Sequence, residues 1–360
     1  MEIEVRVVHA GAWKTNDEYK IKDYSPYVGE LSISDNINSL GAHLRISVDE
    51  SMHDRFFHKT FPGVIPVGSK IFLRDKKTNS GLFSGTIVSK EIIMPGNYIY
   101  EAYDDAFYLN KSMVSVQFNN IDACTAIEDL CRSNSIMVGS ICKISTKIRK
   151  IYHANTIIDV IRDILNQAEL ELGTKYRVEM RVGNRLHIEE YKNLEVKLEP
   201  VAVNSVDTVL PQNAIIDSRY NETMENMITE VQVVSGSERY LKIEGFDEAT
   251  TIDGDPASYT YGKIREVIRI DGKNKSQVDN IIKKRIEESG KPDRALRLKL
   301  FGDIRVRSGR IINAGPYDSN KPWTLSGKYL VKSCVHTYDR KTYHTMELEL
   351  EYQLEENNNA

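Results

Sequence analysis

Two groups of residues in this sequence carry side chains that could act as a nucleophile or as metal ligands. Ser84 lies in residues 81–85 (GLFSG), close to the G-x-S-x-G turn that exposes a catalytic serine. Here the serine stands one place late, and the segment follows a turn instead of leading into a helix. His53 and His58 are five residues apart, whereas paired ligands on a helix are three or four apart. We therefore predict that Ser84 is not a nucleophile, and that His53 and His58 lie in a solvated or interface loop.

Two acidic pairs could bind calcium or act as an acid and a base. Asp253 and Asp255 flank Gly254 as in a calcium-binding loop, but no glutamate follows at the twelfth position and Pro256 interrupts the pattern. A tight turn at residues 253–255 is therefore a better interpretation than a calcium-binding loop. Asp104 and Asp105 are adjacent, and adjacent strand residues point to opposite faces, so they would not share a substrate.

The cysteines have neither a C-x-x-C pair nor the spacing of a zinc site; they are Cys124, Cys131, Cys142 and Cys334. We predict buried free thiols rather than disulfides or metal ligands. The sequence also lacks a glycine-rich phosphate loop, an H-E-x-x-H motif and an ordered Ser, His and Asp set. We therefore predict no catalytic residues, no cofactor and no metal site, and a protein that is not an enzyme.

The composition excludes several classes of protein. The 360-residue chain is long enough for about two to four domains, and its 41% hydrophobic and 28% charged residues are typical of globular proteins. The 48 basic and 52 acidic residues nearly cancel, so no global field would hold the chain on nucleic acid or an anionic membrane. The sequence predicts no membrane span and no signal peptide, so we expect it to stay in the cytoplasm until another protein moves it.

Alternation of apolar and charged residues with a period of two is the dominant pattern. It runs through residues 346–352, where three glutamates separate apolar residues. The same alternation places the following residues on core faces: Ile3, Val5, Val7, Val178, Met180, Val182, Leu296, Leu298, Leu300, Met346, Leu348, Leu350 and Tyr352. One-sided alternation predicts antiparallel sheets with charged non-core faces.

Three segments have the spacing of amphipathic helices. The first carries an apolar stripe from Ala123 to Cys131. The second begins with the capping pattern of Thr156 and Asp159 and ends at Gly173, and the third runs from Ser276 to about residue 289. Because each helix has one apolar face, we expect each to pack on a sheet or a partner.

These elements divide the chain into three predicted domains. Residues 1–118 form a β-rich domain, residues 119–198 an α/β domain with two helices, and residues 199–360 a second β-rich domain with one helix and a long loop over 247–262. The fold class is therefore mainly β with α+β insertions. Several tyrosines lie among charged residues, notably Tyr98, Tyr100, Tyr103 and Tyr108; we interpret them as anchors of a protein interface rather than a platform for nucleic acid.

Residues 327–338 (GKYLVKSCVHTY) and 343–350 (YHTMELEL) resemble the closing hairpin of central baseplate hub proteins of contractile phage tails. In that family a G-x-Y-x-V-x-x-x-x-H strand precedes an H-T-M-x-L-x-L strand. Residues 302–312 fit the strand that enters this barrel, and residues 66–71, 82–88 and 100–109 are similar to the family's first barrel. The hubs in question are those of PBSX-like prophages, of R-type bacteriocins such as diffocins, and of the late-control gene D-like group.

This resemblance implies two tail-tube-like antiparallel β-barrels and a smaller α/β domain in each chain of a homotrimer. Such a hub adapts the six-fold tail tube to the three-fold central spike and nucleates baseplate assembly in a contractile injection tail. The implied partners are the trimeric spike, the tail tube or tube-initiator protein, the tape measure protein and the baseplate wedges, with no membrane and no specific nucleic acid. The chain would pass from the bacterial host cytoplasm into the virion or extracellular tail particle.

Three questions stay open at this point. A cell-wall hydrolase and a glycan- or receptor-binding tail protein are the alternative functions. The sequence also leaves open whether the source is an infectious phage or a bacteriocin, and which faces meet the tube and the spike.

Overall fold

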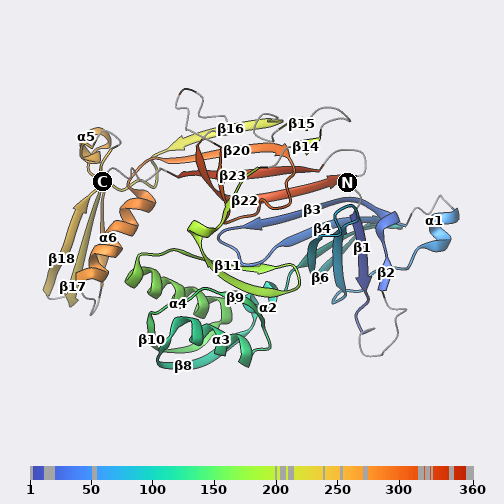
Figure 1. The fold of residues 1–360 in the computed structure, drawn as a ribbon, viewed down its shortest axis with the longest axis horizontal. Helices are drawn as coiled ribbons and strands as arrows, with labels where there is room; N and C mark the ends of the chain where they lie inside the picture. The colour runs from blue at the N-terminus through green and yellow to red at the C-terminus, as the bar shows by residue number, and fades with distance from the viewer. Residues whose placement is uncertain are drawn as a thin grey trace.

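A computed structural model describes residues 3–11, 21–50, 55–198, 201–202, 208–209, 215–237, 240–251, 254–270, 275–314, 320, 325, 327–339 and 344–353. Strands from both ends of the chain form a single thirteen-stranded sheet. In Figure 1 this sheet runs from the top of the molecule to its right-hand side, and two helix-containing parts lie below it and to the left. The predicted class, mainly β with α+β insertions, is confirmed.

Eight consecutive strands of the sheet pair only in the antiparallel sense. In spatial order they are β16 (Asp217–Thr223), β20 (Asp293–Phe301), β23 (Thr345–Gln353), β22 (Lys328–Asp339), β3 (Val28–Asn36), β4 (His43–Asp49), β7 (Asn97–Tyr103) and β6 (Gly81–Met94). The C-terminal strands meet the N-terminal strands where β22 pairs with β3, with His336 opposite Ile33. Both β-rich ends of the chain therefore belong to one hydrogen-bonded layer.

Shorter elements extend this layer. Beyond β6 lie β5 (Lys70–Asp75), β1 (Ile3–Val8) and β2 (Ile21–Asp23), while β13 (Glu195–Val196) pairs with β21 (Ile311–Asn313), which pairs with β22. A separate hairpin consists of β14 (Val201–Ala202) and β15 (Thr208–Val209), and two 3-10 turns are η3 (Ser25–Tyr27) and η4 (Tyr191–Asn193).

The buried face of the large sheet follows the predicted alternation. Met346, Leu348 and Leu350 are buried, and the intervening glutamates lie on the other face of β23. The same holds for Val5 and Val7 in β1 and for the leucines of β20, and together these residues fill two apolar cores. Burying one such side chain stabilises the fold by about 1.5–3 kcal/mol, which explains why the alternation decides which face turns inward.

The middle part of the chain confirms two predicted helices. It contains β8 (Met113–Asp122), α3 (Ala123–Ser133), β9 (Met137–Ile141), β10 (Lys147–Thr156), α4 (Ile157–Leu172), β11 (Tyr176–Arg181) and β12 (Arg185–Glu190). The Thr156 hydroxyl accepts the backbone N–H of Asp159 over 3.2 Å, and Gly173 ends α4 with φ +70°, a left-handed conformation that favours glycine. Leu40 and Leu109 join the core formed by α3 and α4. The domain boundaries at 118 and 198 stay a prediction.

The last part contains β17 (Glu230–Ser237), β18 (Tyr240–Glu248), α5 (Ala257–Tyr261), β19 (Arg265–Arg269) and α6 (Lys275–Ser289). Helix α6 confirms the third predicted helix and begins one residue before Ser276. It approaches β18 so closely that a Cβ on Gly245 would lie 2.7 Å from the Ile282 side chain.

The prediction of a long loop over 247–262 is wrong in part. Strand β18 continues to Glu248, and α5 is held to the strand end because Ala257 N–H donates to Ala249 O over 2.8 Å. Two further helices, α1 (Arg55–Thr60) and α2 (Ala106–Lys111), are not predicted by the sequence pattern. At six residues or fewer, these helices are too short to show a helical period.

Candidate functional site

The structure gives the candidate nucleophile and the candidate metal ligands ordinary partners. Ser84 lies within β6 and its hydroxyl donates to Asn184 Oδ1 over 2.8 Å. His58 lies on α1, with Nδ1 3.1 Å from Glu50 Oε1. His53 and Asp253 lie outside the described residues. Among the residues that are described, no three His, Cys, Asp or Glu side chains form a group able to hold a metal ion.

The two adjacent aspartates have separate structural roles. Asp104 follows the end of β7, so the expectation that both lie within a strand is wrong. Its carboxylate accepts the backbone N–H groups of Ala42 (2.8 Å) and Ala106 (3.0 Å), and Asp105 instead pairs with Lys70 over 3.0 Å. Burial raises the pKa of Asp104 to about 6, against the opposing effect of the Ala42 hydrogen bond. The carboxyl therefore anchors the start of α2, and it does not share a ligand with Asp105.

The four cysteines are free in the structure, but the prediction that all four are buried is wrong for two of them. Cys131 and Cys334 are buried, whereas Cys124 and Cys142 are partly exposed. Over the described part of the chain, no helix combines the length and the apolar character that a membrane crossing needs.

A buried ionic junction lies where the middle part meets the large sheet. Glu179 of β11 accepts Arg310 Nη2 over 2.8 Å and Arg181 Nε over 2.5 Å, and Arg181 also reaches Glu189 over 2.6 Å. Burial raises the pKa of Glu179, but hydrogen bonds and charge from Arg310, with Arg307 and Arg181, outweigh it and lower the pKa to about 2. Glu179 is therefore ionised at every pH at which the protein is ordinarily handled.

A second set of contacts ties the same junction to β3. Asp35 accepts Arg307 Nε over 3.2 Å and the backbone N–H of Ser308 over 3.0 Å. Arg177 donates to Ile37 O and to Ser308 Oγ, both over 2.8 Å. Burial lowers the pKa of Arg307, but the carboxylates of Asp35 and Glu179 raise it overall. Three apolar cores therefore meet at one charged network, which fixes their relative orientation.

This junction corrects the prediction made for β11. Alternation placed Arg177 and Glu179 on a charged non-core face and Val182 on the core face. In the structure Arg177 and Glu179 are buried, and Val182 is 47% exposed just after the strand ends. The physical reason is that β11 is covered on both faces, by the middle core on one and by the 303–310 loop on the other. The sequence carries no signal for the burial of this face. A buried, paired arginine and a solvated arginine both alternate with apolar residues in the same way.

A histidine pair lies beside the junction, with His336 buried and His344 half-buried. His336 Nε2 is 2.8 Å from Val306 O, and because a carbonyl only accepts, this nitrogen carries the proton. His336 Nδ1 therefore accepts from His344 Nε2 over 2.9 Å. Burial and the neighbouring His336 lower the pKa of His344 to about 3. Both rings are thus neutral near pH 7 and serve to join β22 to the segments on either side of it.

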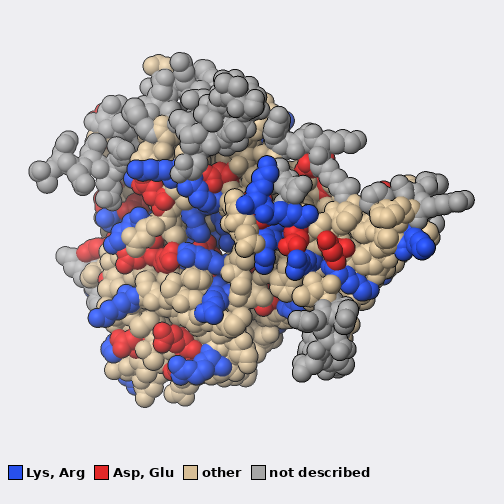
Figure 2. Space-filling view, turned by 45° about the vertical axis from the view of Figure 1, so that its right-hand side comes forward, with Lys and Arg blue, Asp and Glu red and all other residues tan. Residues whose placement is uncertain are grey.

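The face of the eight-stranded layer that points away from the cores is polar. Lys299 pairs with Glu347 over 2.8 Å and Arg297 with Glu349 over 3.4 Å across β20 and β23, and Arg45 lies opposite Glu101 across β4 and β7. Figure 2 shows Lys and Arg side chains interleaved with Asp and Glu over the surface in view. Exposed pairs of this kind contribute at most about 1 kcal/mol each. These pairs therefore contribute little to the stability of the fold, and their regular arrangement instead reflects the surroundings of this face.

The tyrosines divide between the core and the surface. Tyr98 and Tyr100 are buried in the first apolar core, so their interpretation as interface anchors is wrong. The alternation of Tyr98, Tyr100 and Ala102 could have shown this, because it continues the core face of β7. Tyr108 is exposed.

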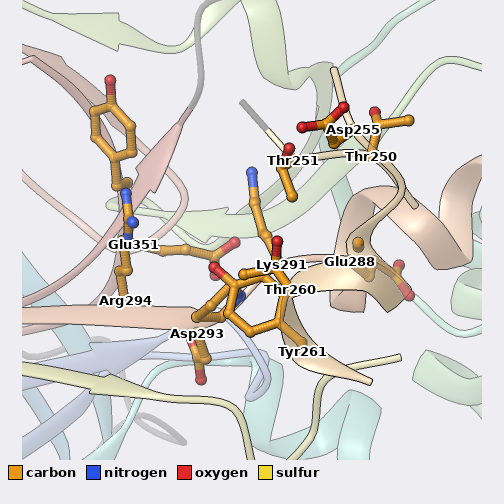
Figure 3. Close-up of a pocket in the computed structure, with 13 residues that line it drawn as sticks. Thr250, Thr251, Asp255, Thr260, Tyr261, Glu288, Lys291, Asp293, Arg294 and Glu351 are labelled. Carbon is orange, nitrogen blue, oxygen red and sulfur yellow. The ribbon is translucent and has the colours of Figure 1, made fainter. Parts of the chain in front are cut away.

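The last part of the chain and the large sheet enclose a cavity of about 430 Å³. Figure 3 shows Lys291 near its centre, with Arg294 and Glu351 from β20 and β23 and with Thr251 and Asp255 across the space. Burial lowers the pKa of Lys291, while Glu351 raises it. The described residues that line the cavity include no His, Cys or Ser. Its mixed charges offer ionic contacts to a polar group, without a nucleophile and base held in reach of each other.

Comparison with known proteins identifies the family. The sequence pattern of a family described as YQBQ-like matches residues 34–351. The chain belongs to the YQBQ-like family. No curated protein matches its sequence.

Solved structures show the same fold at low sequence identity. The tail protein from Neisseria meningitidis MC58 has a TM-score of 0.66 and 12% identity, covering 98% of this chain and 97% of that chain. The 43 kDa tail protein of prophage MuSo2 from Shewanella oneidensis has a TM-score of 0.67 and 11% identity, covering 97% and 98%. The Escherichia coli c3393 protein, a type VI secretion component described as similar to the phage T4 tail proteins gp27 and gp5, has a TM-score of 0.50 and 9% identity, covering 91% and 74%. The fold of this chain is therefore the fold of phage tail proteins.

Proposed function

We propose that this chain is the central baseplate hub of a contractile phage tail or of a related bacteriocin particle. In this role it is a structural protein and not an enzyme. As a homotrimer it joins the six-fold tail tube to the three-fold spike and nucleates the baseplate. Its other partners are the tube-initiator, tape measure and wedge proteins, and its location is first the host cytoplasm and then the tail particle.

The observation that carries the proposal is the two-sided character of the eight-stranded layer. One face covers two separate cores, and the other is polar and charged across strands from both ends of the chain. A face of mixed charge suits a hydrated channel, because it neither attracts nor repels polymers of one charge strongly. Since each chain's layer covers two cores, three chains would present six such units to a six-fold tube.

The structural similarity to two tail proteins, over nearly the full length of each chain, supports the same function. The buried junction at Glu179 also suits a structural part, because it holds the middle part rigidly against the layer. A hydrolase would need a set of reactive groups, and Ser84, His58 and Asp104 are each engaged by separate structural partners.

The test is the native mass of the purified chain by light scattering, alone and with its candidate spike protein. We expect the mass of three chains, or a complex of three hubs with three spike chains. A chain that stays monomeric under both conditions would overturn the proposal. Clearing of peptidoglycan on a zymogram would favour the hydrolase alternative, and specific binding on a glycan array would favour the receptor-binding alternative.

A further inference from the structure

The last part of the chain contains a small sheet with a helix packed on one of its faces. Its strands lie in the order β18, β17 and β19, and β17 and β19 run parallel to each other. Val231 and Val233 of β17 belong to the apolar core that α6 completes. Gly245 of β18 faces the same helix. One face of this sheet is therefore the core of the unit that forms the left-hand end of the molecule in Figure 1.

The opposite face of the small sheet carries exposed apolar side chains. The strand register places Phe246 and Val267 on either side of Gln232, and the two apolar residues are 51% and 57% exposed. Leu241 and Ile243 continue this face toward the start of β18, and they are 58% and 61% exposed. We call these four apolar residues the open apolar face.

A parallel pair of strands is normally covered on both faces, because parallel strands are apolar on both sides. Here α6 covers one face of β17 and β19, whereas more than half of each side chain of the open apolar face stays exposed within the described part of the chain. Contiguous apolar residues with a polar rim mark an interaction site. A helix already covers the inner face, so a second helix would complete a three-layer unit.

The exposed charges around the open apolar face are basic. Arg265 and Arg269 lie on this face, since they alternate with Val267 along β19. The acid next to them, Glu230, is only 3% exposed and is paired with Arg265 over 2.6 Å and with Lys263 over 3.6 Å. A second acid, Glu248, accepts a hydroxyl group of α5. The face therefore presents an apolar centre bordered by cations.

We propose that the open apolar face binds an amphipathic helix of a partner protein. The apolar side of that helix packs on Phe246 and Val267, and acidic residues at its border lie beside Arg269 and Lys263. The Arg265 guanidinium lies 5.4 Å from the centre of the Phe246 ring, so it joins the apolar and the basic parts of the surface.

The charge of this surface argues against a second copy of the chain as its occupant. A two-fold contact brings the same patch of both copies together, and like charges across an interface are unfavourable. The open apolar face also lies in a different sheet from the polar face of the eight-stranded layer. The inference therefore does not depend on the proposed trimer.

A pair of synthetic peptides tests the inference on the full-length chain. Both peptides are fluorescent amphipathic helices with the same stripe of leucines, which is flanked by glutamates in one and by lysines in the other. Titration by fluorescence anisotropy should show that the glutamate peptide binds roughly tenfold tighter or more, because its charges complement those of the face. Equal affinity for the two peptides, or no binding of either, would overturn the proposal.

Substitutions on the open apolar face locate the binding surface. Phe246→Asp and Val267→Asp should each weaken binding of the glutamate peptide by roughly tenfold or more, because each removes an apolar contact at the centre of the face. Arg269→Glu should remove most of the preference for the glutamate peptide. The matched control is Ile151→Asp, which replaces a 68% exposed apolar residue of β10 and should leave both affinities unchanged. Far-ultraviolet circular dichroism checks that each variant is folded.

Hydrogen exchange of the wild-type chain gives a measurement that needs no substitution. The glutamate peptide should slow amide exchange in residues 241–248 and 265–269 and leave residues 147–156 of β10 unchanged. Protection confined to other segments would overturn the site. A loss of self-association in Phe246→Asp, measured by analytical ultracentrifugation, would show that the face joins copies of this chain and would overturn the partner helix. A wild-type chain that stays monomeric but binds the glutamate peptide at this face would support the inference while overturning the hub.

Discussion

Arg310 Nη2 donates to Glu179 Oε1 over 2.8 Å, although the two residues are 131 positions apart in the chain. The side chains are only 11% and 7% exposed. Glu179 belongs to β11 in the middle part, and Arg310 follows the loop after β20. A buried pair of this kind contributes little net stability over an apolar contact, but removing one partner leaves an unpaired buried charge. The pair therefore locks the orientation of two parts of the chain.

Replacing Glu179 should destabilise the protein far more than replacing an exposed acid. We expect Glu179→Gln to lower the free energy of unfolding by about 2–4 kcal/mol at pH 7, because Arg310 and Arg181 lose their shared carboxylate. Urea denaturation measures the change. The matched control is Glu347→Gln, whose exposed pair with Lys299 should be worth less than about 1 kcal/mol. Equal effects of the two substitutions would contradict a buried ionic junction.

The effect of Glu179→Gln should depend on pH. The pKa of Glu179 in the folded protein is about 2, below the value of an unfolded glutamate. A lowered pKa gives stabilisation that is complete above about pH 4.5 and is lost as the pH falls toward 2. The difference in unfolding free energy between wild type and variant should therefore shrink over that range. A difference that stays constant from pH 6 to pH 2.5 would show that the carboxylate is not paired.

Gly309 should tolerate alanine less well than Gly183 does. Both have positive φ, +79° and +93°, so alanine strains the backbone at both by about 1 kcal/mol. At Gly309 the added Cβ would also lie 2.6 Å from Arg177 Nε, whereas at Gly183 nothing lies within 4 Å. We expect Gly309→Ala to lower the melting temperature by several degrees more than Gly183→Ala. Similar losses would mean that Arg177 can move aside, and that the junction is looser than its contacts indicate.

Much of the layer could be predicted from the sequence, because alternation and capping are local signals. Thr156, Asp159 and Gly173 mark the ends of α4 within a single stretch, and the leucines of β20 show their buried face without reference to any partner. What could not be predicted is which strands lie side by side. The pairing of β22 with β3 joins residues about 300 positions apart, and no local pattern encodes it.

The ionic junction was missed for a similar reason. Arg177 and Glu179 look like members of a solvated strand face, since burial of that face depends on the distant loop that carries Ser308 and Arg310. The buried positions of Tyr98 and Tyr100 follow from their alternation with Ala102, which is a stronger signal than the high tyrosine content. Tertiary contacts therefore decide the burial of Arg177 and Glu179, whereas local alternation is enough to predict the burial of Tyr98 and Tyr100.

His344 should make the protein sensitive to acid. Its pKa in the folded state is lowered to about 3 by burial and by His336, whereas an unfolded histidine titrates near 6.5. The stabilisation from the neutral ring is therefore complete above about pH 6.5 and is lost as the pH falls toward 3. We expect His344→Gln, which cannot take up a proton, to flatten the fall in melting temperature between pH 6.5 and pH 4. An unchanged pH profile would show that the ring is solvated.

The four thiols should divide into two classes by reactivity. Burial raises the pKa of Cys131 to about 12 and that of Cys334 well above its ordinary value, so neither forms a thiolate at pH 8. Cys124 and Cys142 are partly exposed, although burial and the charge of Glu190 raise the pKa of Cys142 and slow its reaction. A chromogenic disulfide reagent should therefore titrate Cys124 first and Cys142 more slowly, and should reach all four thiols only in denaturant. In Cys124→Ser the fast phase should disappear, whereas Cys131→Ser should leave the native time course unchanged. A fast phase that is lost in the Cys131 variant would place that side chain at the surface and contradict the packing of α3.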